Sequence, residues 1–124
     1  MPSPALTIKV FGAYAMVAGT GLLLAPALAL APLGIAAPQE VWIRVVGALA
    51  MVVGYYYWAC GAAGATAFFR ASVHGRLAFC LLCLGLVTLA GAPIQLMVFG
   101  LVDVLGAAWT AMALRGAQRA AAGA

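Results

Sequence analysis

Charged residues are scarce in this sequence. Of its 124 residues, six are Lys or Arg, two are Asp or Glu, and one is His. Soluble domains carry charge on about a quarter of their residues, so a water-soluble globular fold is excluded. The basic residues are too scattered for the clustered stripe that nucleic-acid binding requires. We expect membrane lipids, with their anionic headgroups, to be the partner instead.

The sequence also lacks any recognisable catalytic constellation. It has no HExxH motif, no Gly-rich phosphate loop, no paired carboxylates and no Ser-His-Asp set at a plausible depth. Cys80 and Cys83 form a CLLC motif, but zinc and iron–sulfur sites usually need four ligands. Cysteine is also a small apolar residue that suits buried positions. We therefore expect packing roles for these cysteines, and no enzyme activity, metal or cofactor.

Long apolar runs dominate what is present, since 68% of the residues are hydrophobic. A helix that crosses a bilayer needs roughly 20 mostly apolar residues. The breaks between runs fall at APLGIAAPQE, at RASVHGR and at GAP, residues 91–93. These breaks predict an all-α fold, a single transmembrane domain over residues 1–124 that forms a four-helix bundle with short loops. Its predicted spans are residues 8–30, 41–69, 77–92 and 94–114.

The basic residues divide unequally between the two sides of such a protein. With four spans, one side holds both termini and the loop between the second and third spans. That side collects five basic residues, and the other side holds Arg44 alone, beside Glu40. Basic residues concentrate in cytoplasmic segments, so both termini are predicted to be cytoplasmic. Glu40 and Arg44 are four residues apart, which predicts an ion pair at the opposite surface. The five are Lys9, Arg70, Arg76, Arg115 and Arg119.

An alternative interpretation treats residues 1–37 as a cleaved signal peptide, because Ala27-Leu28-Ala29 and Ala29-Leu30-Ala31 resemble cleavage sites. The apolar core of a signal peptide usually has about 7–15 residues, and this run is longer. The charge bias does not distinguish the two, because removing the first span leaves the others oriented as before. An intact-mass measurement would distinguish a cleaved signal peptide from a retained first span.

Small residues recur at helical spacing within the spans. Gly12 and Gly19 are seven residues apart in the first span, and Gly47, Gly54 and Gly61 repeat that spacing in the second. Helices in lipid associate by close backbone approach over small residues. These stripes predict the inner faces of the bundle; a homodimer groove is the alternative. A further inward face is predicted in the fourth span from Gly100, Asp103, Ala107 and Thr110.

Asp103 is the one acidic residue inside a predicted span. An ionised carboxylate is costly in hydrocarbon, so such residues face the bundle, find partners or bind a proton. Asp103 lies 12 residues from Arg115, roughly 18 Å at the helical rise per residue. Counting the same distance from the other cytoplasmic charges predicts a polar layer that contains Thr20, Tyr57, Thr88 and Asp103.

The run GYYYW, residues 54–58, belongs to this layer. Belts of Tyr and Trp normally lie at the membrane surfaces, whereas a second span over residues 41–69 puts these rings near the bilayer centre. Tyr57, with Tyr56 or Tyr55, is predicted to turn a hydroxyl toward Asp103. Such a layer is either a hydrogen-bonded cluster that fixes helix register or a site for a proton or a small polar headgroup.

The segment RASVHGR is predicted to be a polar turn at the cytoplasmic surface, because Gly75 can adopt the conformation that ends a helix. Arg70 and Arg76 are expected to anchor this turn to lipid phosphates. His74 lies between them and is expected to contact solvent, lipid or a headgroup.

The segments VWIRVVG, GYYYW, FFRASVHGR and GAPIQLMVFGLVDVLGAAWTAMALR together resemble a group of small bacterial four-helix membrane proteins, similar in layout to the DoxX-like group. The resemblance covers about residues 41–115 and leaves the first span unmatched. It implies four helices and a bacterial inner-membrane location, and it carries over no catalytic residue.

Two functional hypotheses follow. The first is an accessory or ligand-binding membrane protein, a homo-oligomer or a subunit of a larger complex, that holds a lipid or quinone-like headgroup near Asp103. The second is a proton-coupled transporter with Asp103 as the proton carrier. Because four spans enclose little space, transport would require at least a dimer.

Overall fold

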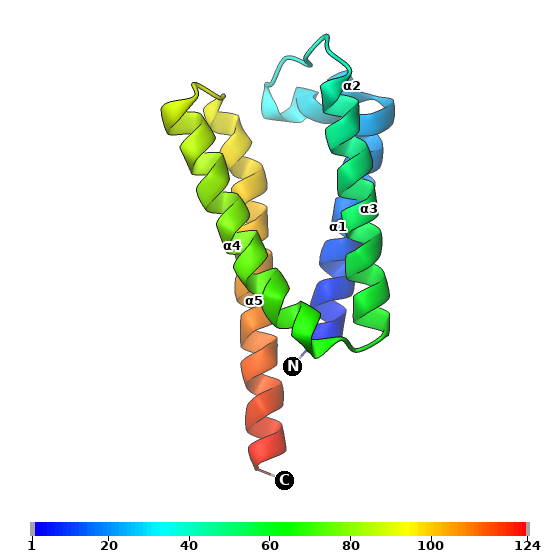
Figure 1. Cartoon of the computed structure of the whole chain (residues 1–124), viewed down its shortest axis with the longest axis vertical. Coiled ribbons are helices and arrows are strands. Elements are labelled where there is room, and N and C mark those ends of the chain that lie inside the picture. The colour runs from blue at the N-terminus through cyan, green and yellow to red at the C-terminus, as the bar shows by residue number, and fades with distance from the viewer. Residues whose placement is uncertain (1, 124) are drawn as a thin grey trace. The chain divides into compact units, whose positions relative to one another are not determined.

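The computed structural model describes residues 2–123, which form helices joined by short connections and contain no strand. The helical segments are α1 (Pro4–Leu24), α2 (Pro26–Leu30), the 3-10 turn η1 (Ala31–Leu33), α3 (Trp42–Ala62), α4 (Thr66–Leu89), the 3-10 turn η2 (Ile94–Leu96) and α5 (Met97–Ala122). Figure 1 shows two antiparallel pairs of long helices, α1 with α3 and α4 with α5.

Four of the helices are long and apolar enough to cross a membrane. They are α1 and α3 with 21 residues each, α4 with 24, and the 29-residue segment Ile94–Ala122 that joins η2 to α5. A helix of about 20 residues spans the roughly 30 Å hydrocarbon core of a bilayer. The predicted all-α fold with four helices that could span a membrane is therefore confirmed.

The predicted turn at RASVHGR is wrong, because these residues lie inside the continuous helix α4. The second and third spans separate earlier, where α3 ends at Ala62 and α4 begins at Thr66. Gly64 supplies the turn with a φ of +67°, a left-handed conformation that glycine adopts without steric cost. Polar side chains alone do not break a helix, and Gly75 remains helical. The predicted span 41–69 is thus seven residues too long at its end.

The other predicted ends shift as well. The first span starts at Pro4 and stops at Leu24, and Pro26 opens the separate short helix α2. Proline lacks a backbone N–H and so cannot continue a helical hydrogen-bond ladder. The last helix runs on to Ala122, past the predicted limit of 114. The break at GAP is confirmed, since Gly91 has a φ of +72° and the chain turns there into η2.

The chain folds as two compact units rather than one. We call residues 9–59 the glycine unit; it contains most of α1 together with α2, η1 and α3. We call residues 2–8 with 60–123 the hairpin unit; it contains the first turn of α1 together with α4, η2 and α5.

Helices α1 and α3 of the glycine unit meet through paired glycines. A Cβ atom added to Gly12 would lie 2.8 Å from the Gly54 carbonyl oxygen, and one on Gly19 would lie 2.6 Å from the Gly47 carbonyl oxygen. Distances this short leave no room for a methyl group, so the backbones touch. Van der Waals contact over small residues is how helices associate in lipid. The predicted role of these four glycines at an inner helix interface is confirmed.

In the hairpin unit, α4 and α5 pack antiparallel, and the C-terminal part of α5 extends beyond α4 (Figure 1). The buried side of the pair includes Phe69 and Cys83 from α4 and Ala107 and Ala113 from α5. Gly100 lies against Cys80, whose Sγ would be 3.2 Å from an added Cβ atom. Both cysteines of the CLLC motif thus lie on the α4 face that contacts α5, which agrees with a packing role.

Candidate functional site

The aromatic run of residues 55–58 lies near the end of α3 and not at its centre. Because α3 ends at Ala62, Trp58 is about 6 Å and Tyr55 about 10 Å from that end along the helix axis. The Lys9 ammonium of α1 lies over the Trp58 ring, 4.9 Å from its centroid. Lys9 and Trp58 therefore share one level, which is nearer the end of α3 than its centre. The prediction of rings at mid-membrane depth was wrong because it rested on an α3 that continued to residue 69.

Within this run, the tyrosines differ in their surroundings. Tyr57 is buried, with 8% of its surface exposed, whereas Tyr55 and Tyr56 are 60% and 54% exposed. The Tyr57 ring contacts Phe11 of α1 with a centroid distance of 5.0 Å. Tyr57 is thus part of the α1–α3 interface, and its two neighbours contact each other on the outside of the unit.

The hydroxyls of the predicted threonines bond to their own helices. Thr20 donates from Oγ1 to the Met16 carbonyl oxygen at 2.7 Å, and Thr88 donates to the Leu84 carbonyl oxygen at 2.8 Å. Thr88 is exposed and does not bond to Asp103, although both residues belong to the hairpin unit. A contact of Asp103 with Thr20 or Tyr57 stays a prediction.

Asp103 itself is half-buried on α5. Its carboxyl group interacts electrostatically with the Arg76 guanidinium and with the Cys83 thiol, both on α4. Asp103 thus lies beside the α4–α5 interface, next to a cation.

A buried polar cluster does exist in the hairpin unit, but it is centred on Arg76. We call Thr7, Ser72, Arg76 and Thr110 the arginine cluster; Arg76 is 1% exposed and Thr110 is fully buried. Arg76 donates from Nη2 to Thr110 Oγ1 at 2.9 Å and to Ser72 Oγ at 3.1 Å. Its Nε donates to the Ser72 carbonyl oxygen at 3.2 Å.

The arginine cluster joins three helices. Thr7 in the first turn of α1 and Thr110 of α5 share a hydrogen bond of 2.8 Å between their hydroxyls, and Arg76 brings α4 to the same point. A buried charge is tolerated only where hydrogen bonds replace its lost hydration. This cluster supplies three such bonds, from Nε and Nη2 of Arg76, so we interpret it as the element that fixes the register of the hairpin unit.

The predicted contact of Arg76 with lipid headgroups is therefore wrong, because the side chain is buried within the protein. Arg70 and His74, also on α4, are exposed, and their headgroup contacts stay predictions. The signals for the arginine cluster were present in the sequence: Ser72 and Arg76 are one helical turn apart, and Thr110 shares a face with Gly100 and Ala107. The mistaken turn at RASVHGR concealed them.

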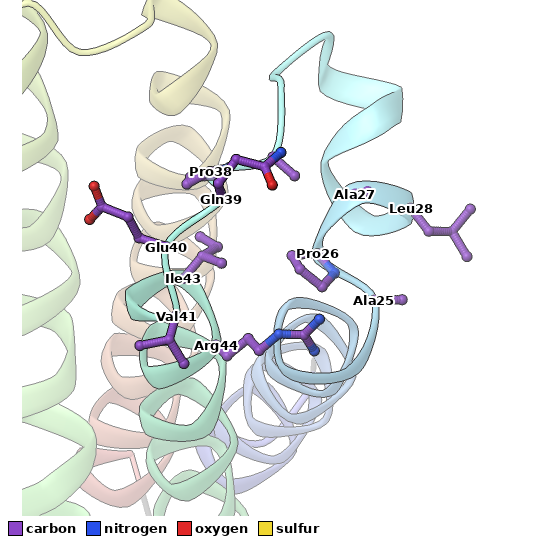
Figure 2. Close-up of a pocket in the computed structure, with 11 residues that line it drawn as sticks. Ala25, Pro26, Ala27, Leu28, Pro38, Gln39, Glu40, Val41, Ile43 and Arg44 are labelled. Atoms are coloured by element: carbon purple, nitrogen blue, oxygen red, sulfur yellow. The ribbon is translucent and has the colours of Figure 1, made fainter.

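At the far end of the glycine unit, Arg44 does not pair with Glu40 as predicted. Arg44 donates from Nη1 to the Leu23 carbonyl oxygen at 2.5 Å and to the Leu24 carbonyl oxygen at 3.3 Å. Glu40 precedes the start of α3, so the two residues lack the helical spacing on which the prediction depended. Figure 2 shows the Glu40 carboxylate directed away from the Arg44 guanidinium.

No protein-family model, curated protein or solved structure matches this chain. The resemblance to the DoxX-like group stays a prediction, and the functional argument depends on the geometry of the chain itself.

Proposed function

We propose that this chain is a small multi-pass protein of the bacterial inner membrane with an accessory, ligand-binding role. In this proposal, Asp103 accepts a hydrogen bond from the polar headgroup of a lipid or quinone-like molecule in the hydrocarbon region. The observation that carries it is the state of Asp103: it is half-buried within a membrane-spanning helix, and the Arg76 guanidinium is near enough to act electrostatically on its carboxyl group.

The cost of a carboxylate in lipid supports a function for this residue. Intramembrane acidic residues are rare and usually mark pathways or sites, because an unpaired charge there costs several kcal/mol. Arg76 reduces that cost, since its guanidinium interacts electrostatically with the Asp103 carboxyl group. In this proposal, the Asp103 carboxylate accepts a hydrogen bond from a ligand that carries a hydroxyl or amine.

The orientation proposed for the chain has both termini in the cytoplasm. The corrected helix ends leave the number of spans unchanged, so Lys9, Arg70, Arg115 and Arg119 still group with the termini. Arg44 lies at the opposite end, where α3 begins. This excess of basic residues on one side supports the orientation.

Native mass spectrometry of the protein purified from membranes tests the ligand. The parent is expected to carry a bound lipid-like molecule, and Asp103→Asn is expected to lose most of it, because the amide offers a weaker acceptor than a carboxylate. Arg119→Gln is the control, since it changes an exposed charged side chain near the end of α5, away from Asp103. Equal ligand occupancy in the parent and in Asp103→Asn would refute the proposal.

A proton-coupled transport assay distinguishes the transporter hypothesis from the binding-protein hypothesis. If Asp103 carries a proton for transport, Asp103→Asn abolishes proton-linked uptake into proteoliposomes while the protein stays folded. A binding protein shows no such uptake in either form.

A further inference from the structure

A pocket lies at the end of the glycine unit opposite the aromatic run. We call it the Arg44 pocket; its volume is about 530 Å³, within the range of small-molecule sites. Figure 2 shows its walls, with α2 on one side and the segment that leads into α3 on the other. The lining residues that matter here are Pro26, Leu28, Pro38, Gln39, Ile43 and Arg44.

The position of the Arg44 pocket places it at the level of a membrane surface. Helix α1 ends at Leu24 and α3 begins at Trp42, and both are long enough to span the bilayer. Gly19 and Gly47 hold these two ends in direct contact, so the ends share one depth. Phospholipid phosphates occupy this level, where a spanning helix leaves the hydrocarbon core.

Arg44 provides a fixed positive charge in this pocket. Its Nη1 is held by the carbonyl oxygens of Leu23 and Leu24, which orient the guanidinium without neutralising it. A guanidinium has five N–H donors, so donors remain for a ligand. Glu40 points away, and Gln39 extends across the top of the pocket toward the α2 side (Figure 2). No carboxylate among residues 2–123 forms an ion pair with Arg44.

Large exposed apolar side chains occur in the same segments as the pocket. Leu28 lines the pocket and is 77% exposed, and Leu24 and Trp42, which adjoin lining residues in the sequence, are 69% and 66% exposed. A free inorganic anion would gain nothing from them, whereas a phospholipid would cover them with its acyl chains. Trp is also the residue type that anchors proteins at headgroup level.

We propose that the Arg44 pocket binds the phosphate diester of a membrane phospholipid. The Arg44 guanidinium donates to the phosphate oxygens, as arginine does in bidentate phosphate recognition, and the Gln39 amide donates to the headgroup. The acyl chains run along Leu24, Leu28 and Trp42. This site is separate from Asp103 and does not depend on the proposed function.

The test uses the full chain in detergent, delipidated and titrated while native mass spectrometry records the bound fraction. The probes are phosphatidylglycerol, a diacylglycerol with the same chains, and inorganic phosphate. The parent is expected to bind phosphatidylglycerol at least about tenfold more tightly than the diacylglycerol, because a hydrogen bond to a charged group is worth about one factor of ten or more. Inorganic phosphate alone is expected to show no saturable binding.

Variants then assign the binding to Arg44. Arg44→Gln keeps a donor for the α1 carbonyls but removes the charge, and it is expected to lose about tenfold in phosphatidylglycerol affinity. Arg44→Lys keeps the charge but loses the planar pair of donors, so its affinity is expected to fall between those of the parent and Arg44→Gln. Arg115→Gln removes an exposed arginine near the end of α5 and serves as the matched control.

Three results would overturn the inference. One is equal binding of phosphatidylglycerol and the diacylglycerol by the parent, which needs no variant and so is independent of folding. Another is unchanged affinity in Arg44→Gln. The third is saturable binding of inorganic phosphate that competes with the lipid, which would make the ligand a free anion and not a phospholipid.

Discussion

Arg76 of α4 and Thr110 of α5 are joined by a buried hydrogen bond of 2.9 Å, and the same threonine hydroxyl meets Thr7 of α1 at 2.8 Å. A single hydroxyl thus connects three helices. It accepts from a charged donor and is removed from solvent, which are the conditions under which a hydrogen bond contributes most to stability.

Thr110→Val is expected to lower the free energy of unfolding by about 1–3 kcal/mol, because it leaves a buried guanidinium without one of its acceptors. Thermal or denaturant unfolding in detergent measures the change. Thr88→Val is the control on an exposed position and is expected to have little effect. Equal stability of both variants and the parent would show that the arginine cluster does not hold the hairpin unit together.

Substitutions of Arg70 and Arg76, the two arginines of RASVHGR, are expected to differ in their effect on stability. Arg76→Gln removes a buried charge and its hydrogen bonds and is expected to destabilise by about 1.5–3 kcal/mol. Arg70→Gln changes an exposed side chain and is expected to be within about 0.5 kcal/mol of the parent. If Arg70→Gln proved the more damaging of the two, the burial of Arg76 would be contradicted. Paired unfolding curves under one condition make the comparison.

Gly47→Ala is expected to disrupt the glycine unit. The added Cβ atom would lie 2.5 Å from the Leu23 backbone nitrogen and 2.6 Å from the Gly19 carbonyl oxygen, so the helices must separate, at a cost of about 1–3 kcal/mol. At Gly85 the same substitution meets no atom within 4 Å and is expected to be neutral or stabilising by up to about 1 kcal/mol. Unfolding of both variants in detergent tests the contrast, and equal losses would argue against close α1–α3 contact.

Single cysteines introduced into a background lacking Cys60, Cys80 and Cys83 test the orientation. Ala63→Cys lies in the turn between α3 and α4, and Gln39→Cys lies before α3. The excess of basic residues predicts that an impermeant maleimide added to intact cells labels Gln39→Cys alone. Labelling of Ala63→Cys alone would reverse the orientation, and labelling of both would indicate two orientations.

Much of the helical content follows from local composition. The four spans and the break at GAP were predicted because apolar length, proline and glycine act on the chain within a few residues of where they stand. The glycine stripes were also predicted, since a repeat of seven places Gly12 with Gly19, and Gly47 with Gly54, on one helical face each. The prediction failed at RASVHGR, where the polar residues were interpreted as a turn although they all lie within the helix α4.

That local error changed the expected site. With α3 extended to residue 69, Tyr57 was placed at the centre of the bilayer, and Arg76 was placed at its surface. The true helix ends move the aromatic run to the level of Lys9 and bury Arg76 between helices. Similarly, the predicted ion pair between Arg44 and Glu40 depended on both residues being helical, whereas Glu40 lies outside α3. Arg44 instead donates to two backbone carbonyl oxygens.

By itself, the sequence determined that this chain is helical, suited to a membrane and built with glycine at a close helix contact. These properties depend on composition and on spacing along one helix. Tertiary structure decided which polar groups meet: Thr7, Arg76 and Thr110 lie far apart in the chain, and only the packing of α1, α4 and α5 brings them within hydrogen-bond distance. Partner choice among buried polar groups depends on the register between helices, which no single helix encodes.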